Sequence, residues 1–394
     1  MMFWIMVLMA ISGLIATDLF VPSLPVLAET FHQPANHIEL TITLFLMGFA
    51  ASQLFYGPVS DRMGRKAPII LGVSLFCIGS LSCLLAPSFA WLCVGRIIQG
   101  IGAGSGLSLS RVVLRDLYQG TSLAIKSSQM AIFICISPAI APCVGGWLQA
   151  GFGYKAPFVF MLLYGLFLLT LLLTQFKETI RHRDTELTLS NTLKHYAELL
   201  RNFMFMRYVT TAGIGFGAVI LYANIIPFIV QNQLHYTATE NGYILLCGAL
   251  GLTFTALIGS KIVHRFHAYH LTITGLILLL LSGMLMIITE YFMGTHVIPL
   301  VILLFMTTMS CGLLLPNSLA LAFSNVHVKI GIAGAIYGTT QILIAMGINF
   351  VLNTISHQTQ SLLGTFYVVM GIFGLALILL RKHSSSLPSN DERL

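Results

Sequence analysis

The sequence has 394 residues, of which 57% are hydrophobic and only 8% are charged. A soluble domain carries roughly 25% charged residues, so no soluble fold would bury this much apolar side chain. Lipid must therefore surround most of the chain, and the composition predicts an all-α integral membrane protein. The formal net charge of +7 would suggest nucleic acid in a soluble protein. Here the basic residues lie in short loops between apolar runs, so we expect no nucleic-acid partner.

Apolar runs recur along the chain, and a helix needs roughly 20 apolar residues to cross a bilayer. In chain order, we expect twelve spans at 3–27, 38–57, 67–86, 89–110, 124–148, 156–176, 207–231, 241–261, 269–289, 296–318, 329–352 and 361–380. The first run lacks a basic segment and a cleavage site, so we interpret it as a retained span and not as a signal peptide.

The longest polar stretch divides the spans into two sets of six. We predict an N-terminal six-helix bundle at 1–176, a cytoplasmic linker at 177–206, a C-terminal six-helix bundle at 207–380 and a cytoplasmic tail at 381–394. Residues 189–201 of the linker have the spacing of an amphipathic helix, which is typical of a membrane surface. Pro22 and Pro227 follow polar breaks in the first and seventh spans, which indicates two related halves.

The distribution of Lys and Arg predicts the orientation, because cytoplasmic loops are enriched in these residues. With the N-terminus in the cytoplasm, every Lys and Arg lies in a cytoplasmic segment except Arg96 within the fourth span, Arg111 at its end and Lys155 outside. The outer loops then hold acidic residues, namely Glu29, Glu39, Glu240 and Glu290. The opposite orientation would reverse this asymmetry, so we expect both termini in the cytoplasm.

Two charged residues lie well inside predicted spans, Asp18 in the first and Arg96 in the fourth. Each such charge costs at least about 2.5–3.5 kcal/mol near the bilayer centre, so an intramembrane charge indicates a functional site. The two spans run in opposite directions and place both groups at similar depth, where we expect them to face one another. We predict that they couple proton movement to transport. The alternative is an ion pair that only fixes the packing of the two spans.

Polar uncharged residues inside the spans are candidates for contact with a substrate. Besides Asp18, these candidates are Gln99, Tyr222, Asn224, Asn317 and Gln341. The alternative for each is a hydrogen bond between helices, since amides often join helices in membranes. The cysteines lie inside apolar runs, and no His or Cys pair has the spacing of a metal site, so we expect no metal, cofactor or disulfide.

The loop after the second span reads Gly-Pro-Val-Ser-Asp-Arg-Met-Gly-Arg-Lys over residues 57–66. Gly57 and Gly64 permit a tight turn. Asp61 and Arg65 stand four residues apart, so they can pair if the segment is helical. Arg62 adds a further positive charge on the expected cytoplasmic side.

This loop resembles the loop 2–3 signature of the major facilitator superfamily, and four other segments agree. Residues 17–25 resemble the first-span signature of its drug:proton antiporters, and 96–104 match the pattern R-x-x-Q-G-x-G-A-G. Residues 138–146 resemble the antiporter signature of the fifth span, which contains Pro138, Pro142, Gly145 and Gly146. Residues 111–118 resemble a stretch of the bicyclomycin-resistance (Bcr/CflA) branch. Phe20 departs from the family pattern, which has an aromatic hydroxyl there.

The resemblance implies a monomeric exporter in a bacterial inner membrane that binds its small-molecule substrate between the two bundles. It implies coupling to protons through Asp18 and Arg96. It also implies that Asp61 and Arg65, together with Gly57, Arg62, Gly64 and Asp116, form a cytoplasmic latch. Proline and glycine in the fifth span are expected to serve as packing or hinge elements.

Several other functions are weighed against a drug:proton antiporter. An exporter of one natural metabolite, such as a siderophore, amino acid or peptide, would use the same architecture. A membrane-embedded enzyme is not supported, because no nucleophile–base arrangement or metal cluster is evident in the sequence. A nucleotide-driven pump would need a phosphate-binding loop, which the sequence lacks. A channel would differ from a carrier in that its flux would not saturate.

Overall fold

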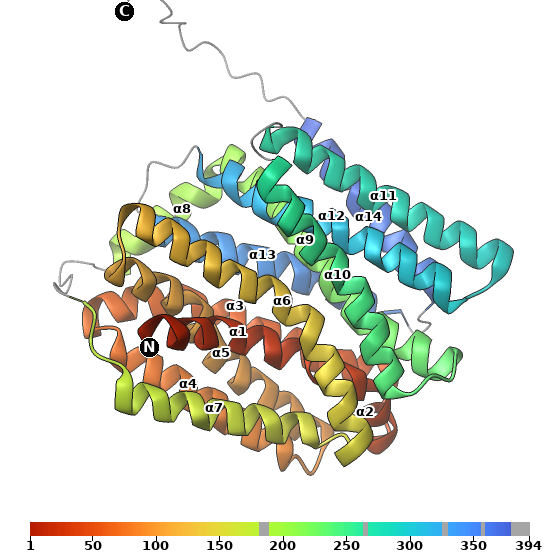
Figure 1. The fold of residues 1–394 in the computed structure, drawn as a ribbon, viewed down its shortest axis with the longest axis horizontal. Helices are drawn as coiled ribbons and strands as arrows, with labels where there is room; N and C mark the ends of the chain where they lie inside the picture. Colours follow the sequence, from red (N-terminus) through yellow and green to blue (C-terminus); the bar gives the residue numbers. More distant parts are fainter. Residues whose placement is uncertain (181–188, 263–266, 325–329, 356–358, 380–394) are drawn as a thin grey trace, which may run out of the picture.

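The computed structural model describes residues 1–180, 189–262, 267–324, 330–355 and 359–379, and within these ranges the chain is helical and contains no strand (Figure 1). The first half contains α1 (Met2–Asp18), the short turn η1 (Val21–Ser23), α2 (Leu24–Thr30), α3 (Ala35–Met63), α4 (Lys66–Leu84), α5 (Phe89–Leu117), α6 (Gly120–Phe152) and α7 (Ala156–Gln175). The rest contains α8 (Leu189–Arg201), α9 (Phe203–Phe228), the π-turn η2 (Ile229–Gln233), α10 (Ala238–Ile262), α11 (Ala268–Met293), α12 (Val297–Phe323), α13 (Ile330–Asn353) and α14 (Gln360–Leu379).

Each of the twelve predicted spans coincides with a helix or with a helix and a short adjoining turn. In the described part of the chain, eleven of these segments are long and apolar enough to cross a membrane. The remaining predicted span corresponds to α10, which has 25 residues. The prediction of an all-α membrane protein with twelve spans is confirmed. The helices lie side by side in two groups, with α1 to α7 in one and α9 to α14 in the other (Figure 1).

The first and seventh spans are both interrupted near the same end of the molecule. Helix α1 ends at Asp18 and continues through η1 into α2, while α9 passes into the π-turn η2 directly after Phe228. The two interruptions touch, because Gln231 Nε2 donates a hydrogen bond of 2.9 Å to the carbonyl oxygen of Pro22. We call this end of the molecule the Pro22 end and the opposite one the Arg65 end.

Two expectations about α3 were wrong. The span was predicted to end at Gly57, but the helix continues through Gly57 and Pro58 to Met63. The turn is made by Gly64 alone, whose φ of 97° lies in the left-handed region that glycine adopts without strain. Glu39 was expected in an outer loop but lies within α3 and is fully buried. Pro58, near the end of α3, is tolerated within the helix because neighbouring groups in a helical bundle can bind the backbone carbonyl that proline leaves without a donor.

Helix α5 is packed closely against α3 and α4, and glycine makes this approach possible. A side chain at Gly100 would overlap the backbone of Phe45 in α3, and one at Gly102 would overlap the backbone of Phe76 in α4. Small residues at such contacts let helix backbones approach closely in membranes, where packing drives association. The close approach fixes the position of Arg96, which lies one turn before Gly100 on the same helix.

The predicted amphipathic helix at 189–201 is confirmed as α8. Its Tyr196 hydroxyl donates to the carbonyl oxygen of Leu54 in α3 at 3.2 Å, and Leu199 is buried. The helix therefore packs against the Arg65 end of the bundle through its apolar face. The predicted tail at 381–394 lies outside the described residues.

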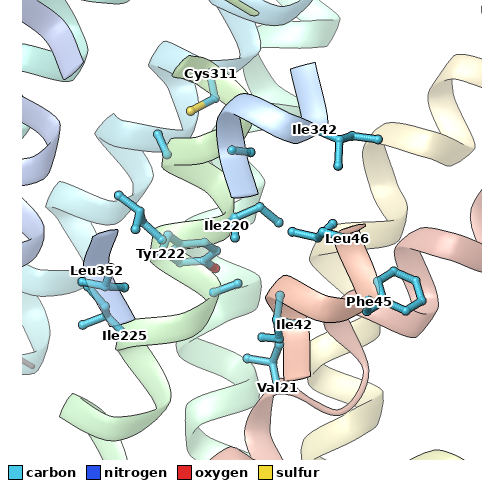
Figure 2. Close-up of a cluster of buried hydrophobic side chains, with 14 of the residues drawn as sticks. Val21, Ile42, Phe45, Leu46, Ile220, Tyr222, Ile225, Cys311, Ile342 and Leu352 are labelled. Atoms are coloured by element: carbon cyan, nitrogen blue, oxygen red, sulfur yellow. The ribbon is translucent and has the colours of Figure 1, made fainter. Parts of the chain in front are cut away.

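Buried apolar residues from both halves meet in one continuous core. Figure 2 shows Val21, Ile42, Phe45 and Leu46 of the first half near Ile220 and Ile342 of the second. On the outside of this core, Trp147 Nε1 of α6 donates to the Tyr243 hydroxyl of α10 at 3.0 Å. The two halves are thus in contact through both apolar and polar groups.

Candidate functional site

Asp18 occupies the last position of α1, where the helix is interrupted. Its side chain is only 6% exposed. Within the described residues, no hydrogen bond or ion pair joins its carboxyl group to another side chain. The hydroxyl-bearing ring of Tyr222, in α9 of the other half, lies within electrostatic range of the carboxyl group. Asp18 is therefore a nearly buried acid at the boundary between the two halves.

Arg96 is fully buried in α5 and is held by backbone groups and aromatic rings. Its Nη1 donates to the carbonyl oxygen of Ala16 at 3.0 Å, and its Nε donates to the carbonyl oxygen of Thr41 at 3.4 Å. The guanidinium carbon stands 4.2 Å from the ring centre of Phe20 and 4.4 Å from that of Phe45. Such cation–π contacts stabilise a guanidinium most when water is excluded.

Among the described residues, Asp18 and Arg96 form no ion pair, so the alternative of an ion pair that fixes packing is wrong. Their coupling to protons stays a prediction. The nearest link is indirect, since Arg96 binds the carbonyl oxygen of Ala16, two residues before Asp18. Phe20, where the family pattern has an aromatic hydroxyl, serves as a partner for Arg96. Arg96 is thus held by carbonyl groups and rings instead of by Asp18, while its Nη2 is buried without a hydrogen-bond partner among the described residues.

Gln99 lies beside Arg96 inside the first bundle. It accepts from Arg96 Nη1 at 2.6 Å, and its Nε2 donates to Ser80 Oγ of α4 at 2.8 Å. The same Nε2 lies 3.2 Å from the sulfur of Met161 in α7. The amide thus links α5 to α4 and α7 within the bundle, and its role toward a substrate stays a prediction.

A chain of polar side chains crosses from the second half to the first. Asn224 Nδ2 of α9 donates to Asn349 Oδ1 of α13 at 2.5 Å, and Asn349 Nδ2 donates to Thr43 Oγ1 of α3 at 2.6 Å. Near the middle of α3, Thr339 Oγ1 of α13 donates to the carbonyl oxygen of Ala50 at 3.2 Å. Sequence reasoning did not select Thr43, because one threonine in a span carries no local signal.

The other predicted substrate contacts come from three helices of the second half. The Tyr222 hydroxyl donates to the carbonyl oxygen of Leu245, and Asn317 Nδ2 donates to that of Leu313 at 2.7 Å. Both residues are buried, whereas Gln341 of α13 is half-buried. The structure thus distributes these candidates through the second half, and their role toward a substrate stays a prediction.

Three residues of the predicted latch contact one another at the Arg65 end, and their role as a latch stays a prediction. Arg65 Nη1 donates to Asp61 Oδ1 at 2.5 Å, and Arg65 Nε donates to Asp116 Oδ2 at 2.9 Å. Arg65 is buried, and burial would lower its pKa, but the hydrogen bonds and charges of Asp116 and Asp61 raise it. Asp61, Arg65 and Asp116 therefore join α3, α5 and the start of α4, while Arg62 is exposed.

Two residues of the predicted linker complete this network, and sequence reasoning missed both. Glu178 accepts from the backbone N–H of Arg65 at 2.9 Å and of Lys66 at 3.1 Å, which caps the first turn of α4. Thr179 Oγ1 donates to Asp116 Oδ2 at 3.0 Å. Partial burial would raise the pKa of Glu178, but the backbone N–H donors, including those of Ile180 and Thr179, lower it. An acid directly after a span is an available signal for such a cap.

The fifth-span pattern lies in α6, which contains Pro138 and Pro142 within the helix. A side chain at Gly145 would overlap the carbonyl oxygen of Leu19, the residue after Asp18. A Cβ at Gly146 would come within 2.5 Å of the Ala238 carbonyl oxygen in α10. Adjacent glycines thus bring α6 against the interrupted first span on one side and against the second half on the other.

Comparison with known proteins decides the family. A model of the Major Facilitator Superfamily matches residues 6–348. The chain belongs to this superfamily. Within it, the chain is 28% identical over 374 residues to the uncharacterised transporter YdgK of Bacillus subtilis, covering 93% of this chain and 92% of that protein.

Two further relatives carry names that refer to drug resistance. Multidrug resistance protein D of Escherichia coli is 26% identical over 374 residues, covering 95% of this chain and 93% of its own. Multidrug resistance protein MdtL of Escherichia coli is 29% identical over 267 residues, covering 68% of this chain and 67% of its own. Among solved structures, a D-xylose–proton symporter shares the major facilitator fold with a TM-score of 0.80, at 15% identity and 96% coverage of each chain.

The chain is thus a multi-pass membrane transporter with the two-bundle fold predicted from its sequence. In the described segments, no three His, Cys, Asp or Glu side chains gather into a candidate metal site.

Proposed function

We propose that this major facilitator protein is a drug:proton antiporter of the Bcr/CflA branch, which exports small amphiphilic molecules from a bacterial cytoplasm by alternating access. It would act as a monomer in the inner membrane, with both termini, the linker at 177–206 and the Arg65 end on the cytoplasmic side. The domain division into 1–176, 207–380 and the tail at 381–394 is part of the same proposal. The names of the two multidrug resistance relatives support export.

The observation that carries the proposal is the position of Asp18. The acid is nearly buried, it ends a helix, and it has Tyr222 of the opposite half within electrostatic range. An ionised carboxylate in this place has a large desolvation cost, whereas a protonated carboxyl does not. Gain or loss of the proton would therefore change the relative stability of two packings of the halves.

Arg96 acts in this proposal as a positioning residue. Its bond to the Ala16 carbonyl oxygen holds the last turn of α1, so the place of Asp18 depends on it. Gly145 supports the same turn from α6, because it packs on the Leu19 carbonyl oxygen. A movement of α6 against α10 would therefore reach Asp18 through backbone contacts alone.

The latch of Asp61, Arg65 and Asp116 would stabilise the state whose Arg65 end is closed. One proton that moves inward down about 100 mV releases about 2.3 kcal/mol, and one pH unit adds about 1.4 kcal/mol. The sum allows roughly hundredfold or greater accumulation of a substrate. This drives export without a nucleotide.

Proteoliposomes with an imposed pH gradient test the proposal. Proton movement is followed after addition of lipophilic cations, neutral antibiotics and metabolites, with wild type, Asp18→Asn and Glu29→Gln. Glu29 is an exposed acid at the same end of the molecule. We expect at least one compound to release protons with wild type and Glu29→Gln only. Equal responses from wild type and Asp18→Asn would place the coupling residue elsewhere.

A further inference from the structure

Arg111 is a charged side chain in α5 that neither the latch nor the proton site uses. It is exposed although it lies within a membrane-spanning helix. Among the described residues, no hydrogen bond or ion pair joins it to another group. Arg111 lies just after the predicted fourth span at 89–110, so water can solvate its exposed guanidinium at the Arg65 end of the helix.

The location of Arg111 shows which surface of α5 this site occupies. Arg111 lies 15 residues after Arg96, which places it about 22 Å further along the helix toward the Arg65 end. Arg111 is within electrostatic range of Tyr337, which belongs to α13 of the second half. Tyr337 is only 5% exposed and packs on Phe323 at 5.8 Å, so it lies inside the second half and not in the lipid. Arg111 therefore faces the boundary between the halves.

A second arginine lies beside Arg111, and the nearest acids are bound to other residues. Arg115 follows by four residues, so it lies on the same face of α5, and it interacts electrostatically with Arg111. Asp116, the nearest acid in sequence, accepts bonds from Arg65 and Thr179. Asp61 is likewise engaged with Arg65. Two arginines at the Arg65 end thus present a positive charge between the halves.

We propose that Arg111, with Arg115 and the Tyr337 hydroxyl, binds an anionic group of the transported molecule, such as a carboxylate or phosphate. The inference rests on the proposed export function and narrows its substrates to amphiphiles with an anionic head group. A guanidinium donates paired hydrogen bonds to such groups. The Tyr337 hydroxyl donates to the carbonyl oxygen of Leu315 at a long 3.5 Å, and it would exchange this bond for one to the anion. The site lies on the side from which an exported molecule enters.

Binding to the full-length protein in nanodiscs tests this without a proton gradient. The probes are dansylglycine, dansylamide and dansylcadaverine, which share one fluorophore and carry a negative, no and a positive charge. We expect wild type to bind dansylglycine about tenfold more tightly than dansylamide, because a charge-assisted hydrogen bond contributes that much. Arg111→Gln should lose this preference but still bind dansylamide, and Arg111→Lys should keep part of it. Arg201→Gln removes an exposed charge on the same side and should behave as wild type.

Three outcomes would overturn the proposal. The first is that wild type binds dansylglycine no better than dansylamide. The second is that Arg111→Gln keeps the preference. The third is that the anionic lipid phosphatidylglycerol displaces dansylglycine. This is measured by comparing nanodiscs of phosphatidylcholine alone with nanodiscs that also contain phosphatidylglycerol. If the anionic lipid displaces the probe, its head group is the occupant. Because no proton gradient is used, failure here leaves the Asp18 test of the exporter untouched.

Discussion

Gly145 of α6 lies so close to the carbonyl oxygen of Leu19 that a methyl group at position 145 would overlap it. Leu19 follows Asp18, so the backbone of the antiporter pattern and the interrupted first span form one contact. The neighbouring Gly146 packs in the same way on α10 of the other half. Backbone segments of α1, α6 and α10 therefore meet at the Pro22 end.

This contact predicts the effect of one added methyl group. Gly145→Ala should destabilise the protein by about 1–3 kcal/mol, since overpacking of a tight contact costs this much. Gly151→Ala is the matched control, because nothing lies within 4 Å of the position that its Cβ would take in the same helix. Thermal unfolding of the purified variants measures both. Equal melting temperatures for the two variants would contradict the close packing.

The surroundings of Arg96 predict that lysine cannot replace it. Arg96→Gln should lower the free energy of unfolding by about 3 kcal/mol, because buried carbonyl groups lose a charged donor. Arg96→Lys should restore little of this, since one ammonium cannot reach the carbonyl oxygens and both rings together. Chemical unfolding measures the change, with Arg201→Gln as an exposed control expected within about 0.5 kcal/mol of wild type. Full stability of Arg96→Lys would show that only charge matters there.

Glu178 predicts a dependence of stability on pH. Because its pKa in the folded protein lies below the ordinary value of 4.5, its contribution is fully present above that pH. The contribution is lost as the pH falls through the lower, folded pKa. Melting temperatures should therefore fall in acid more for wild type than for Glu178→Gln, which lacks the titrating group. Glu198→Gln, an exposed acid on α8, should fall as wild type does. Parallel curves for all three proteins would argue against the helix cap.

The hydrogen bond from Asn349 to Thr43 predicts a coupling between the halves. In a double-mutant cycle, Thr43→Val and Asn349→Ala should be coupled by about 0.6 kcal/mol, the average for hydrogen bonds between membrane helices. Thr43→Val with Asn317→Ala should be additive within about 0.5 kcal/mol, because Asn317 bonds to Leu313 in its own helix. Unfolding free energies measure both cycles. Additivity in the first cycle would mean that the bond does not join the halves in solution.

The latch residues show which contacts can be predicted from residue spacing and which cannot. Asp61 and Arg65 were predicted to pair from their spacing, and the structure confirms it. Asp116 was added from a family resemblance, and in the structure its Oδ2 lies 2.9 Å from Arg65 Nε. Glu178 was not found, although it follows a span directly, because its partners are backbone N–H groups that the folded chain brings together from 113 and 112 positions away. A backbone N–H group is common to almost every residue, so the types of side chain in the sequence do not identify such a partner.

The membrane class, the twelve spans and their division into two bundles could all be predicted from the amino-acid sequence. Long apolar runs indicate that lipid surrounds the segment. In lipid, a spanning backbone must satisfy its own hydrogen bonds, which a helix does. The sequence also indicated Asp18 and Arg96, because charges in such runs are rare and costly. Only the tertiary structure decided what these charges touch. Arg96 is held by carbonyl groups of α1 and α3 and by two rings, and Arg111 faces α13. Those contacts depend on how helices rotate and cross, which is set by glycine contacts between distant parts of the chain.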